Sequence, residues 1–407
     1  MNSTLNAQRS ASNAQPFLSL RREWSAGSRH GREDPDARAK LEVGNSNLWN
    51  ILRCLDSARH DKLEALVRSV NSPRSIRAFR RALLQWFRRN GRDLPWRKTR
   101  DPYAVLVSEF MLQQTQVATV IPYYNRWLRQ FSDFASVARA SQNAVLHAWQ
   151  GLGYYSRARN LHAAAKTVQA RYGGVFPGDI AEILKLPGVG RYTANAVATF
   201  AFNQPAPIVE ANSSRVLARL FDMRASVDSA IGREKLWENA ARLLAKRNTA
   251  RFNSALIDLG ALVCLPHKPK CELCPVKKFC RTRDPEKLPI KKSKPGIKRV
   301  LEKHAFIVSN GRLLLEQSSE RWRGMWILPR FEARTSDQPL YKSIFPFTNH
   351  RIALVVYRRE TPHRIVPTQQ WFESIDDIAM PSPHRRAAQA LLSAKQVARP
   401  RRPRSSE

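Results

Sequence analysis

Four cysteines crowd into one short segment of the chain in the pattern Cys-x6-Cys-x2-Cys-x5-Cys, at Cys264, Cys271, Cys274 and Cys280. Thiolates at such intervals can surround one compact metal centre, whereas a disulfide framework spreads cysteines through the fold. Two centres compete: a structural zinc ion, usually held by two Cys-x2-Cys pairs, and an iron–sulphur cluster, which accepts one loop with unequal spacings. Because only one such pair is present, the spacing favours a four-iron, four-sulphur (4Fe-4S) cluster.

A glycine-containing turn, Leu186-Pro187-Gly188-Val189-Gly190-Arg191, lies between two helical patterns. Its glycines let a phosphate approach the backbone, and the amides that open the second helix add partial positive charge. Such a turn holds a nucleic-acid backbone without reading its sequence. The alternative is a tight turn between helices that needs glycine for steric reasons alone.

The charge balance favours the nucleic-acid interpretation. The 407 residues carry 69 Lys and Arg against 33 Asp and Glu, a formal net charge of +36, which suits a polyanionic partner, with nucleic acid ahead of an anionic membrane surface. No apolar run approaches the roughly 20 residues that cross a bilayer, and the N-terminus lacks a secretory hydrophobic region. We expect an intracellular protein, cytoplasmic and nucleoid-associated in a bacterium, or nuclear or mitochondrial in a eukaryote.

One carboxylate lies where core residues are expected. Val105, Glu109 and Leu112 are spaced i, i+4 and i+7 along a predicted helix, so the acid shares a face with apolar side chains. Burial raises the pKa of a carboxyl group and keeps it protonated near neutral pH, as general-acid catalysis requires. The alternative is a helical glutamate that reaches solvent or pairs with an arginine.

The elements that must position these residues fall into two predicted domains. Long helix-like apolar runs punctuated by Gly and Pro predict an all-helical domain, and a later change to strand-like runs around an Asn310-Gly311 turn predicts an α+β domain. The expected boundaries are an N-terminal extension over 1–75, disordered in its first half, the helical domain over 76–283, a Pro- and Lys-rich linker over 284–300, the α+β domain over 301–395 and a basic tail over 396–407.

Five segments occur in one order along the chain: Leu94-Pro95-Trp96-Arg97, Ser108 to Gln116, Gly151-Leu152-Gly153-Tyr154-Tyr155, the glycine-containing turn and the cysteine loop. In this order the chain resembles the MutY-type adenine DNA glycosylases of the helix-hairpin-helix superfamily, relatives of endonuclease III, over about residues 76–360. The resemblance implies a mainly α glycosylase domain with a 4Fe-4S loop and a smaller α+β MutT-like domain. It further implies a monomer that excises adenine opposite 8-oxoguanine or guanine from double-stranded DNA in base excision repair.

The resemblance assigns three catalytic residues. Glu109 protonates N7 of the adenine and then helps water to attack the sugar cation. Glu210 stands where the family has an aspartate that stabilises this cation, although it could also cap the helix that follows it. Tyr192 stands where bifunctional relatives carry the lysine that forms a Schiff base, which predicts a monofunctional enzyme.

The resemblance also assigns contacts to DNA. Gln114 and Tyr154 match residues that fill the base stack opposite the flipped base, and Asp258 matches an acid that contacts adenine, although Tyr154 and Asp258 could each be structural. In the second domain, Phe347-Thr348-Asn349-His350 matches the loop that examines oxidised guanine, with an asparagine displacing the family's histidine. The full set of expected DNA and base contacts is Trp96, Arg97, Gln114, Thr115, Tyr154, Gly188, Gly190, Asp258, Phe347 and Thr348.

Two other functions compete with adenine excision. One is an endonuclease III-like glycosylase and lyase acting on another base, which Tyr192 disfavours because tyrosine cannot form the Schiff base. The other is a DNA-binding iron–sulphur protein whose catalysis is impaired by the longer side chain of Glu210. Alkali-dependent cleavage, direct nicking and binding without base release would distinguish the three.

Overall fold

A computed structural model of the chain describes residues 72–293, 295–332 and 337–397. Nearly all of the predicted N-terminal extension (1–75) and of the predicted basic tail (396–407) lies outside these residues. Within them, no helix is both long and apolar enough to cross a membrane.

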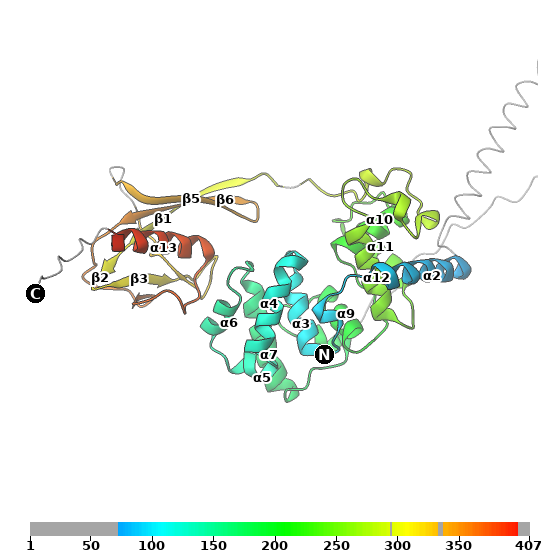
Figure 1. Ribbon diagram of the computed structural model, residues 1–407, viewed down its shortest axis with the longest axis horizontal. Helices are drawn as coiled ribbons and strands as arrows, with labels where there is room; N and C mark the ends of the chain where they lie inside the picture. Colours follow the sequence, from blue (N-terminus) through cyan, green and yellow to red (C-terminus); the bar gives the residue numbers. More distant parts are fainter. Residues whose placement is uncertain (1–71, 294, 333–336, 398–407) are drawn as a thin grey trace, which may run out of the picture. The chain divides into compact units, whose positions relative to one another are not determined.

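The first of the two regions is helical, as the sequence predicts (Figure 1). Its α-helices are α2 (Pro73–Asn90), α3 (Pro102–Leu112), α4 (Val117–Gln130), α5 (Phe134–Arg139), α6 (Gln142–Ala148), α7 (Ser156–Tyr172), α8 (Ile180–Ile183), α9 (Arg191–Phe200), α10 (Ala211–Leu220), α11 (Ala230–Leu243) and α12 (Thr249–Leu262). Short 3-10 helices are η1 (Pro95–Arg97), η2 (Cys271–Leu273), η3 (Lys277–Phe279) and η4 (Pro285–Lys287).

Local signals in the sequence explain where the first helix begins and ends. Ser72 and Ser75 form a reciprocal capping box and Pro73 occupies the first helical position, where its missing N–H is no loss. Gly91 ends the helix with φ −63°, so it is not the left-handed cap that glycine often provides. Its role is steric, because a Cβ atom there would lie 2.7 Å from the Phe87 ring.

Helix α3 lies at the centre of the helical region. Asp101 caps its N-terminus by accepting from the backbone N–H groups of Tyr103 and Ala104. Residues 103–111 are all buried, as expected for a helix that is apolar on almost every side and is covered on all of them. It packs against α4, α7 and α9, and thereby holds Glu109 inside the domain.

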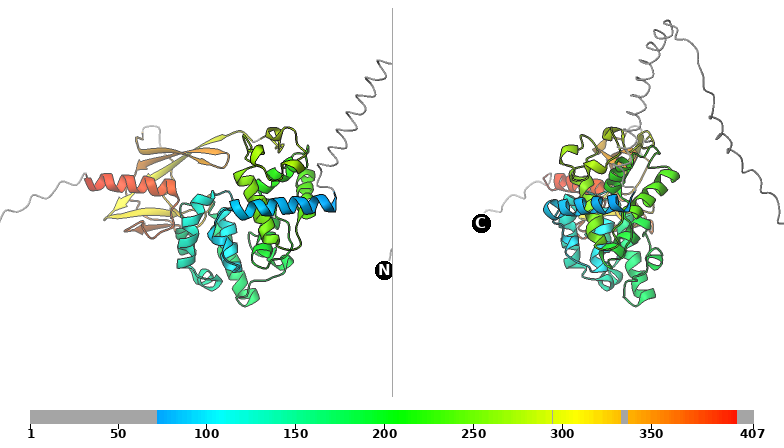
Figure 2. Two further views of the ribbon diagram at one scale, coloured as in Figure 1. Left: turned by 45° about the vertical axis from the view of Figure 1, so that its right-hand side comes forward. Right: turned by 90° about the vertical axis from the view of Figure 1, so that its right-hand side faces the viewer.

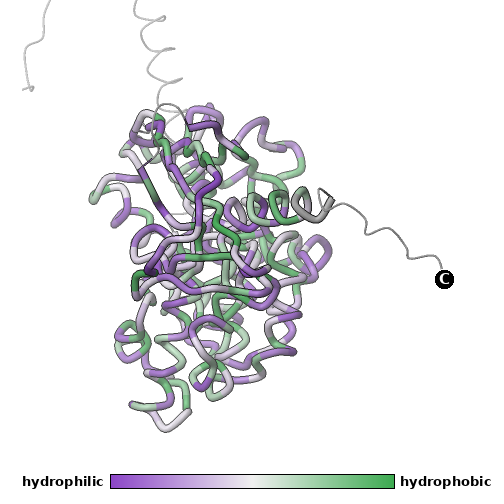
Figure 3. Tube along the Cα trace, turned by 90° about the vertical axis from the view of Figure 1, so that its left-hand side faces the viewer, coloured by the Kyte–Doolittle hydropathy of each residue, from purple (hydrophilic) through white to green (hydrophobic). Residues whose placement is uncertain are grey.

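Two hydrophobic cores organise the helical region. The first gathers apolar side chains of α3, α4, α6, α7 and α9, and the second those of α2, α10, α11 and α12. Edge-to-face contacts join Phe79 of α2 to Phe252 and Phe279 in the second core. Figure 2 shows these helices from two further sides, and in Figure 3 hydrophobic and hydrophilic stretches alternate along the trace, as amphipathic helices require.

The second region contains two small sheets and one long helix. Strands β1 (Lys298–Phe306), β6 (His350–Arg358) and β5 (Pro339–Phe347) form one sheet, with β1 parallel and β5 antiparallel to β6. Strands β2 (Val308–Ser309), β3 (Arg312–Gln317), β4 (Trp326–Ile327) and β7 (Gln369–Phe372) form the other. Helix α13 (Ser382–Val397) lies between the sheets in the views of Figures 1 and 2.

The structure refines the predictions for this region. Asn310 and Gly311 have φ values of 48° and 76°, which confirms the expected type I′ turn between β2 and β3. Strand β1 begins at Lys298, so the last residues of the predicted linker already belong to the sheet. Helix α13, over Ser382–Val397, supplies the helical part of the predicted α+β domain.

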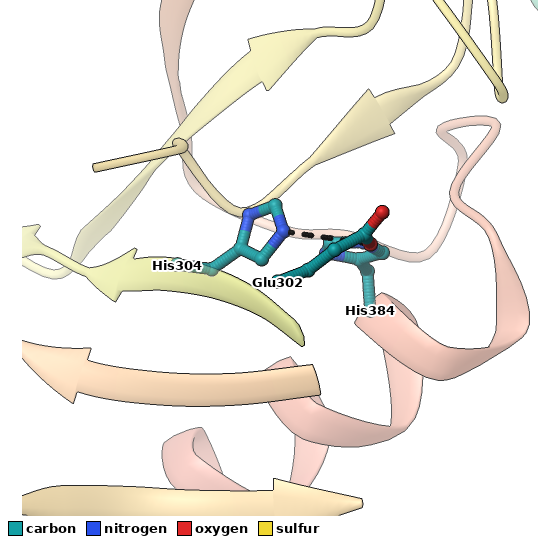
Figure 4. Close-up of side chains that lie close together, drawn as sticks. All are labelled: Glu302, His304 and His384. Carbon is teal, nitrogen blue, oxygen red and sulfur yellow. Dashed lines mark ion pairs between the residues drawn. The ribbon is translucent and has the colours of Figure 1, made fainter. Parts of the chain in front are cut away.

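A buried polar trio ties β1 to α13 (Figure 4). Atoms of Glu302, His304 and His384 that could bind a metal lie within 4.8 Å of one another. Because Leu328 N–H donates to His384 Nδ1 and burial keeps this histidine neutral by lowering its pKa, its proton resides on Nε2, which faces the trio. Arg321 donates to the Glu302 carboxylate. Glu302 Oε2, His304 Nε2 and His384 Nε2 are buried without a hydrogen-bond partner among the described residues.

Candidate active site

Glu109 occupies the buried position that the sequence predicts. Its side chain projects from α3 and the residue is only 4% exposed. Burial raises the pKa of this carboxyl group to about 7, and the hydrogen bond from Tyr192 and the charge of Arg97 limit the increase. The group can thus exist in both protonation states near neutral pH, which suits an acid that later acts as a base.

Tyr192 joins Glu109 from the second residue of α9. Its hydroxyl donates a hydrogen bond of 2.7 Å to Glu109 Oε2. Burial raises the pKa of the Tyr192 hydroxyl well above its usual value, and the adjacent Glu109 raises it further. The tyrosine therefore remains a neutral donor, and it fixes one carboxylate oxygen in place.

Glu210 lies at the start of α10, close enough for its charge to raise the pKa of both Glu109 and Tyr192. It caps this helix: Oε1 accepts from Ser213 N–H at 2.7 Å, and the Ser213 hydroxyl accepts from Glu210 N–H at 2.9 Å. Its Oε2 accepts from Asn212 Nδ2 at 3.2 Å. Burial raises the pKa of Glu210, and these hydrogen bonds oppose that shift. The capping role is thus present, and the residue also belongs to the same electrostatic cluster as Glu109.

Asp258 is completely buried on α12 and is held by two arginines. Arg97 donates to both carboxylate oxygens at 2.8 and 2.9 Å, and Arg92 donates through its side chain at 2.7 Å and its backbone N–H at 2.8 Å. Although burial alone would raise the pKa of Asp258, the arginines hold it below its usual range. Because both oxygens are engaged, Asp258 positions Arg97, and its contact with adenine stays a prediction.

Two exposed side chains lie on tight turns, one at the C-terminal end of α3 and the other at the N-terminal end of α7. Gln114 follows α3 with φ 56°, and Tyr154 precedes α7 with φ 47°; both values are unusual for residues other than glycine. The side chain of Gln114 is exposed and Tyr154 is 40% exposed, so Tyr154 is not a core residue. Thr115 is half-buried, and its hydroxyl is 3.3 Å from Gln113 O.

The glycine-containing turn connects α8 to α9. Gly188 has φ 74°, and a Cβ atom there would lie 2.5 Å from Asn160 of α7, so the turn needs glycine both for its backbone conformation and for close packing. Gly190 is the N-cap of α9 and has open space where a Cβ would be. A phosphate could approach the α9 amides at this position.

The remaining predicted contact residues lie elsewhere. Trp96 is 8% exposed and packs edge-to-face on Tyr124, so it is a core residue in this structure. Phe347 ends β5, and Thr348 has φ 52° in the two-residue turn to β6. Arg321 lies 5.0 Å from the centre of the Phe347 ring.

The four cysteines line one loop beside the second core. All four are free thiols of intermediate exposure, and burial raises the pKa of Cys274 to about 12 and that of Cys280 to about 11. Arg219, which is 1% exposed, donates to Cys264 Sγ at 3.2 Å and to the carbonyls of Leu265, Pro266 and Leu288. This cation ties the start of the loop to α10.

The spacing of the sulphur atoms bears on what the loop can hold. Around zinc, Zn–S bonds of about 2.3 Å in a tetrahedron place sulphur atoms about 3.8 Å apart. An iron–sulphur cluster is held by four cysteine thiolates and accepts unequal intervals between them along the chain.

Sequence reasoning missed three arginines of this region: Arg92, Arg157 and Arg219. Each is held by partners distant in the chain, and only Arg92 carries a usable signal, since it lies five residues before Arg97 in the same short segment. In a chain with 69 Lys and Arg, a buried arginine does not stand out.

Comparisons with known proteins show which proteins this chain resembles. The family profile of the HhH-GPD superfamily base excision DNA repair proteins matches residues 107–242. An adenine DNA glycosylase of Buchnera aphidicola subsp. Baizongia pistaciae is 36% identical over 260 residues, which cover 62% of this chain and 74% of the relative. The human adenine DNA glycosylase is 45% identical over 218 residues, 51% of this chain and 40% of the relative. A solved thermostable thymine-DNA glycosylase is 34% identical, covering 50% of this chain and 94% of its own, with a TM-score of 0.48.

The helical fold, the glycine-containing turn and the buried carboxylates therefore define a helix-hairpin-helix protein of base excision DNA repair. Within that class, the extent of the match to the Buchnera relative decides the family. The chain belongs to the adenine DNA glycosylases.

Proposed function

We propose that this protein is a monofunctional adenine DNA glycosylase that removes adenine mispaired with 8-oxoguanine or guanine. The observation that carries the proposal is the buried Glu109, whose pKa is about 7 and whose Oε2 accepts a hydrogen bond from Tyr192. Membership of the adenine DNA glycosylases indicates adenine as the excised base, and the buried acid can donate the proton that cleavage of the glycosidic bond requires.

The reaction begins with the transfer of adenine out of the duplex, because a stacked base cannot reach a buried acid. Protonated Glu109 then gives its proton to N7 of the adenine, and the glycosidic bond breaks as positive charge develops on the sugar. The carboxylate of Glu210 stabilises that charge, in the manner of the second carboxylate of a glycoside hydrolase. Ionised Glu109 finally takes a proton from the attacking water.

Tyr192 makes the enzyme monofunctional. A lysine at this position could attack the sugar carbon and form a Schiff base that leads to strand cleavage, but a phenol whose pKa is raised well above its usual value remains neutral and cannot form an imine. The product is therefore an abasic site in an intact strand. An endonuclease III-like lyase would need an amine here.

We propose that Cys264, Cys271, Cys274 and Cys280 hold a 4Fe-4S cluster. The donor set of four free thiols, with a single Cys-x2-Cys pair among them, supports a cluster over a single zinc ion. When bound, the cluster would supply structural organisation of the loop rather than redox steps in the excision. Lys268, Lys270, Lys277 and Lys278 border the cysteines and would face phosphates.

The remaining assignments concern the partner. Gln114 and Tyr154 fill the stack opposite the flipped base, Gly188 and Gly190 receive the phosphate backbone, and Phe347 and Thr348 contact the base opposite adenine. The net charge of +36 supports a strong dependence of binding on salt. The protein acts as a monomer on double-stranded DNA.

Single-turnover excision from a duplex with adenine opposite 8-oxoguanine tests the proposal. We expect cleavage of the strand only after alkali treatment, and we expect Glu109→Gln to reduce excision by at least about 1,000-fold while it still binds the duplex. The matched control is Glu182→Gln, which alters a half-buried glutamate of α8 that also accepts a tyrosine hydrogen bond, of 2.8 Å. Normal excision by Glu109→Gln would refute the assignment of the acid, and nicking without alkali would refute monofunctional action.

A further inference from the structure

Arg157 is buried in the first turn of α7 at 5% exposure, and its guanidinium donates to five backbone carbonyls. Two segments supply them. Nη1 donates to Phe110, Met111 and Gln113 at 2.9, 2.7 and 2.6 Å, and Nη2 donates to Leu152 and Gly153 at 3.1 Å each. The first set ends at the residue before Gln114, and the second ends at the residue before Tyr154.

The carbonyls at the end of α3 need a donor from outside their own segment, whereas the Gly153 carbonyl also accepts from Trp149 Nε1 at 3.2 Å. Phe110 and Met111 belong to the last turn of α3, whose carbonyls have no partner within the helix. A cation at this C-terminal end also interacts favourably with the helix dipole. The Leu152 and Gly153 carbonyls lie in a turn rather than in a helix. One guanidinium thus caps the helix that carries Glu109 and at the same time ties down the turn that carries Tyr154.

Arg157 also contacts the aromatic ring of Tyr154, whose centre lies 5.4 Å from the guanidinium carbon. Among the described residues no carboxylate pairs with Arg157, and burial lowers its pKa to about 10. A buried cation whose partners are backbone carbonyls and the rings of Trp149 and Tyr154 is a costly way to fill space, since an apolar side chain would do so without desolvating a charge. Its value must lie in the geometry that it enforces.

We propose that Arg157 is a positioning residue that holds the Gln113–Gln114 turn and the Gly153–Tyr154 turn at one fixed separation, and so sets how Gln114 and Tyr154 enter the base stack. The inference rests on the proposed function, because it assigns Arg157 to the base-extrusion step of that reaction. Both turns carry a non-glycine residue at positive φ, a conformation that persists only where the surroundings fix it. Five hydrogen bonds from one planar group provide that fixation.

Arg157→Lys tests the proposal, because a single ammonium keeps the charge but cannot reach both sets of carbonyls. We expect single-turnover excision of adenine opposite 8-oxoguanine to fall by about 10- to 100-fold, the range expected when one aromatic stacking contact with a base is lost. The fluorescence of 2-aminopurine next to the mispair, which reports unstacking upon binding, should lose most of its increase. The matched control is Arg171→Lys, since Arg171 lies on the same helix with its guanidinium carbon 5.4 Å from the Tyr172 ring but is exposed.

A double-mutant cycle separates positioning from general destabilisation. If Arg157 acts through Gln114 and Tyr154, Arg157→Lys should reduce excision less than threefold in a Gln114→Ala/Tyr154→Ala background, because both side chains that it positions are already gone. A reduction in that background equal to the one in the wild type would overturn the proposal. Single-turnover rate constants measured with enzyme in excess depend on the active molecules alone, so a partly unfolded preparation does not mimic the effect.

A second variant covers the case in which Arg157→Lys does not fold. Gly153 has φ 70°, and no atom lies within 4 Å of the place that a Cβ would take, so Gly153→Ala strains this turn without a clash. It should reduce the 2-aminopurine signal as Arg157→Lys does, and an unchanged signal would count against the proposal. If the wild-type protein releases no adenine, the proposed function is wrong, whereas normal excision and unstacking by Arg157→Lys would leave that function intact and refute the positioning role.

Discussion

Replacement of Tyr192 by phenylalanine removes one hydroxyl and leaves the ring in place. That hydroxyl donates to Glu109 Oε2 at 2.7 Å and therefore favours the ionised carboxylate. A hydrogen bond to a charged group contributes about 1.5 to 3 kcal/mol, and each pKa unit corresponds to about 1.4 kcal/mol. Loss of the donor should thus raise the pKa of Glu109 from about 7 by about 1 to 2 units.

The pH profile of excision reports this shift because the protonated form of Glu109 delivers the proton. In the wild type, the single-turnover rate constant should fall with a midpoint near pH 7, so that about one tenth of the low-pH plateau remains at pH 8. In Tyr192→Phe the midpoint should move to about pH 8 to 9, so that half or more of its own plateau remains at pH 8. Each variant is compared with its own plateau, which removes any change in the maximal rate.

Tyr172→Phe is the matched control, because the Tyr172 hydroxyl also donates to a glutamate, Glu182 of α8, at 2.8 Å, and both of these residues are only half-buried. Its profile should coincide with that of the wild type. A basic limb that stays near pH 7 or moves to lower pH in Tyr192→Phe would refute the reasoning, since it would show that another group delivers the proton.

Three further outcomes follow from the same contacts. The folded pKa of Glu109 is about 7 and its ordinary value is 4.5. Burial of the ionised acid therefore destabilises the fold increasingly as the pH rises between these values, and the full effect is present above pH 7. By urea unfolding, Glu109→Gln should be more stable than the wild type by about 3 kcal/mol at pH 8.5 and by roughly half of that at pH 5.5. In Glu210→Gln the new side chain can still accept from Ser213 N–H, so the free energy of unfolding should change by less than about 1 kcal/mol. Single-turnover excision by this variant should nevertheless fall by at least about 100-fold, because the negative charge is lost. Glu210→Asp keeps the charge and the cap, so its excision should stay within about tenfold of the wild type. Arg219→Met removes the donor to Cys264 Sγ and leaves buried carbonyls unpaired. The iron content and the absorbance of the purified variant should therefore be at least twofold lower than those of the wild type. Equal values in the variant and the wild type would contradict the structural role of Arg219.

The sequence was sufficient to predict the helical domain, because apolar residues at helical spacing and glycine or proline at segment ends act locally. It was also sufficient for Glu109, since a carboxylate among core positions of one helix is visible within eight residues. Strand β5 was missed because its inward and outward residues are both partly apolar, and its pairing with β6 depends on contacts rather than on composition.

Partners across the chain were beyond the reach of local patterns. The hydroxyl of Tyr192 meets Glu109 across 83 residues, and Asp258 meets Arg97 across 161. Neither pair has a periodic signal, because each depends on how whole helices pack. For the same reason the sequence could place Asp258 near the base but could not show that two arginines already occupy its oxygens.

Gly188 has a mechanical consequence that its backbone angle alone does not suggest. The glycine rests against Asn160, which lies on α7 one turn after Arg157. One helix, α7, therefore contacts the turn that would bind the sugar–phosphate backbone and also carries Arg157, the residue proposed to position Gln114 and Tyr154. Under the proposed function, binding of the phosphate backbone at this turn and entry of Gln114 and Tyr154 into the base stack would be coupled through α7.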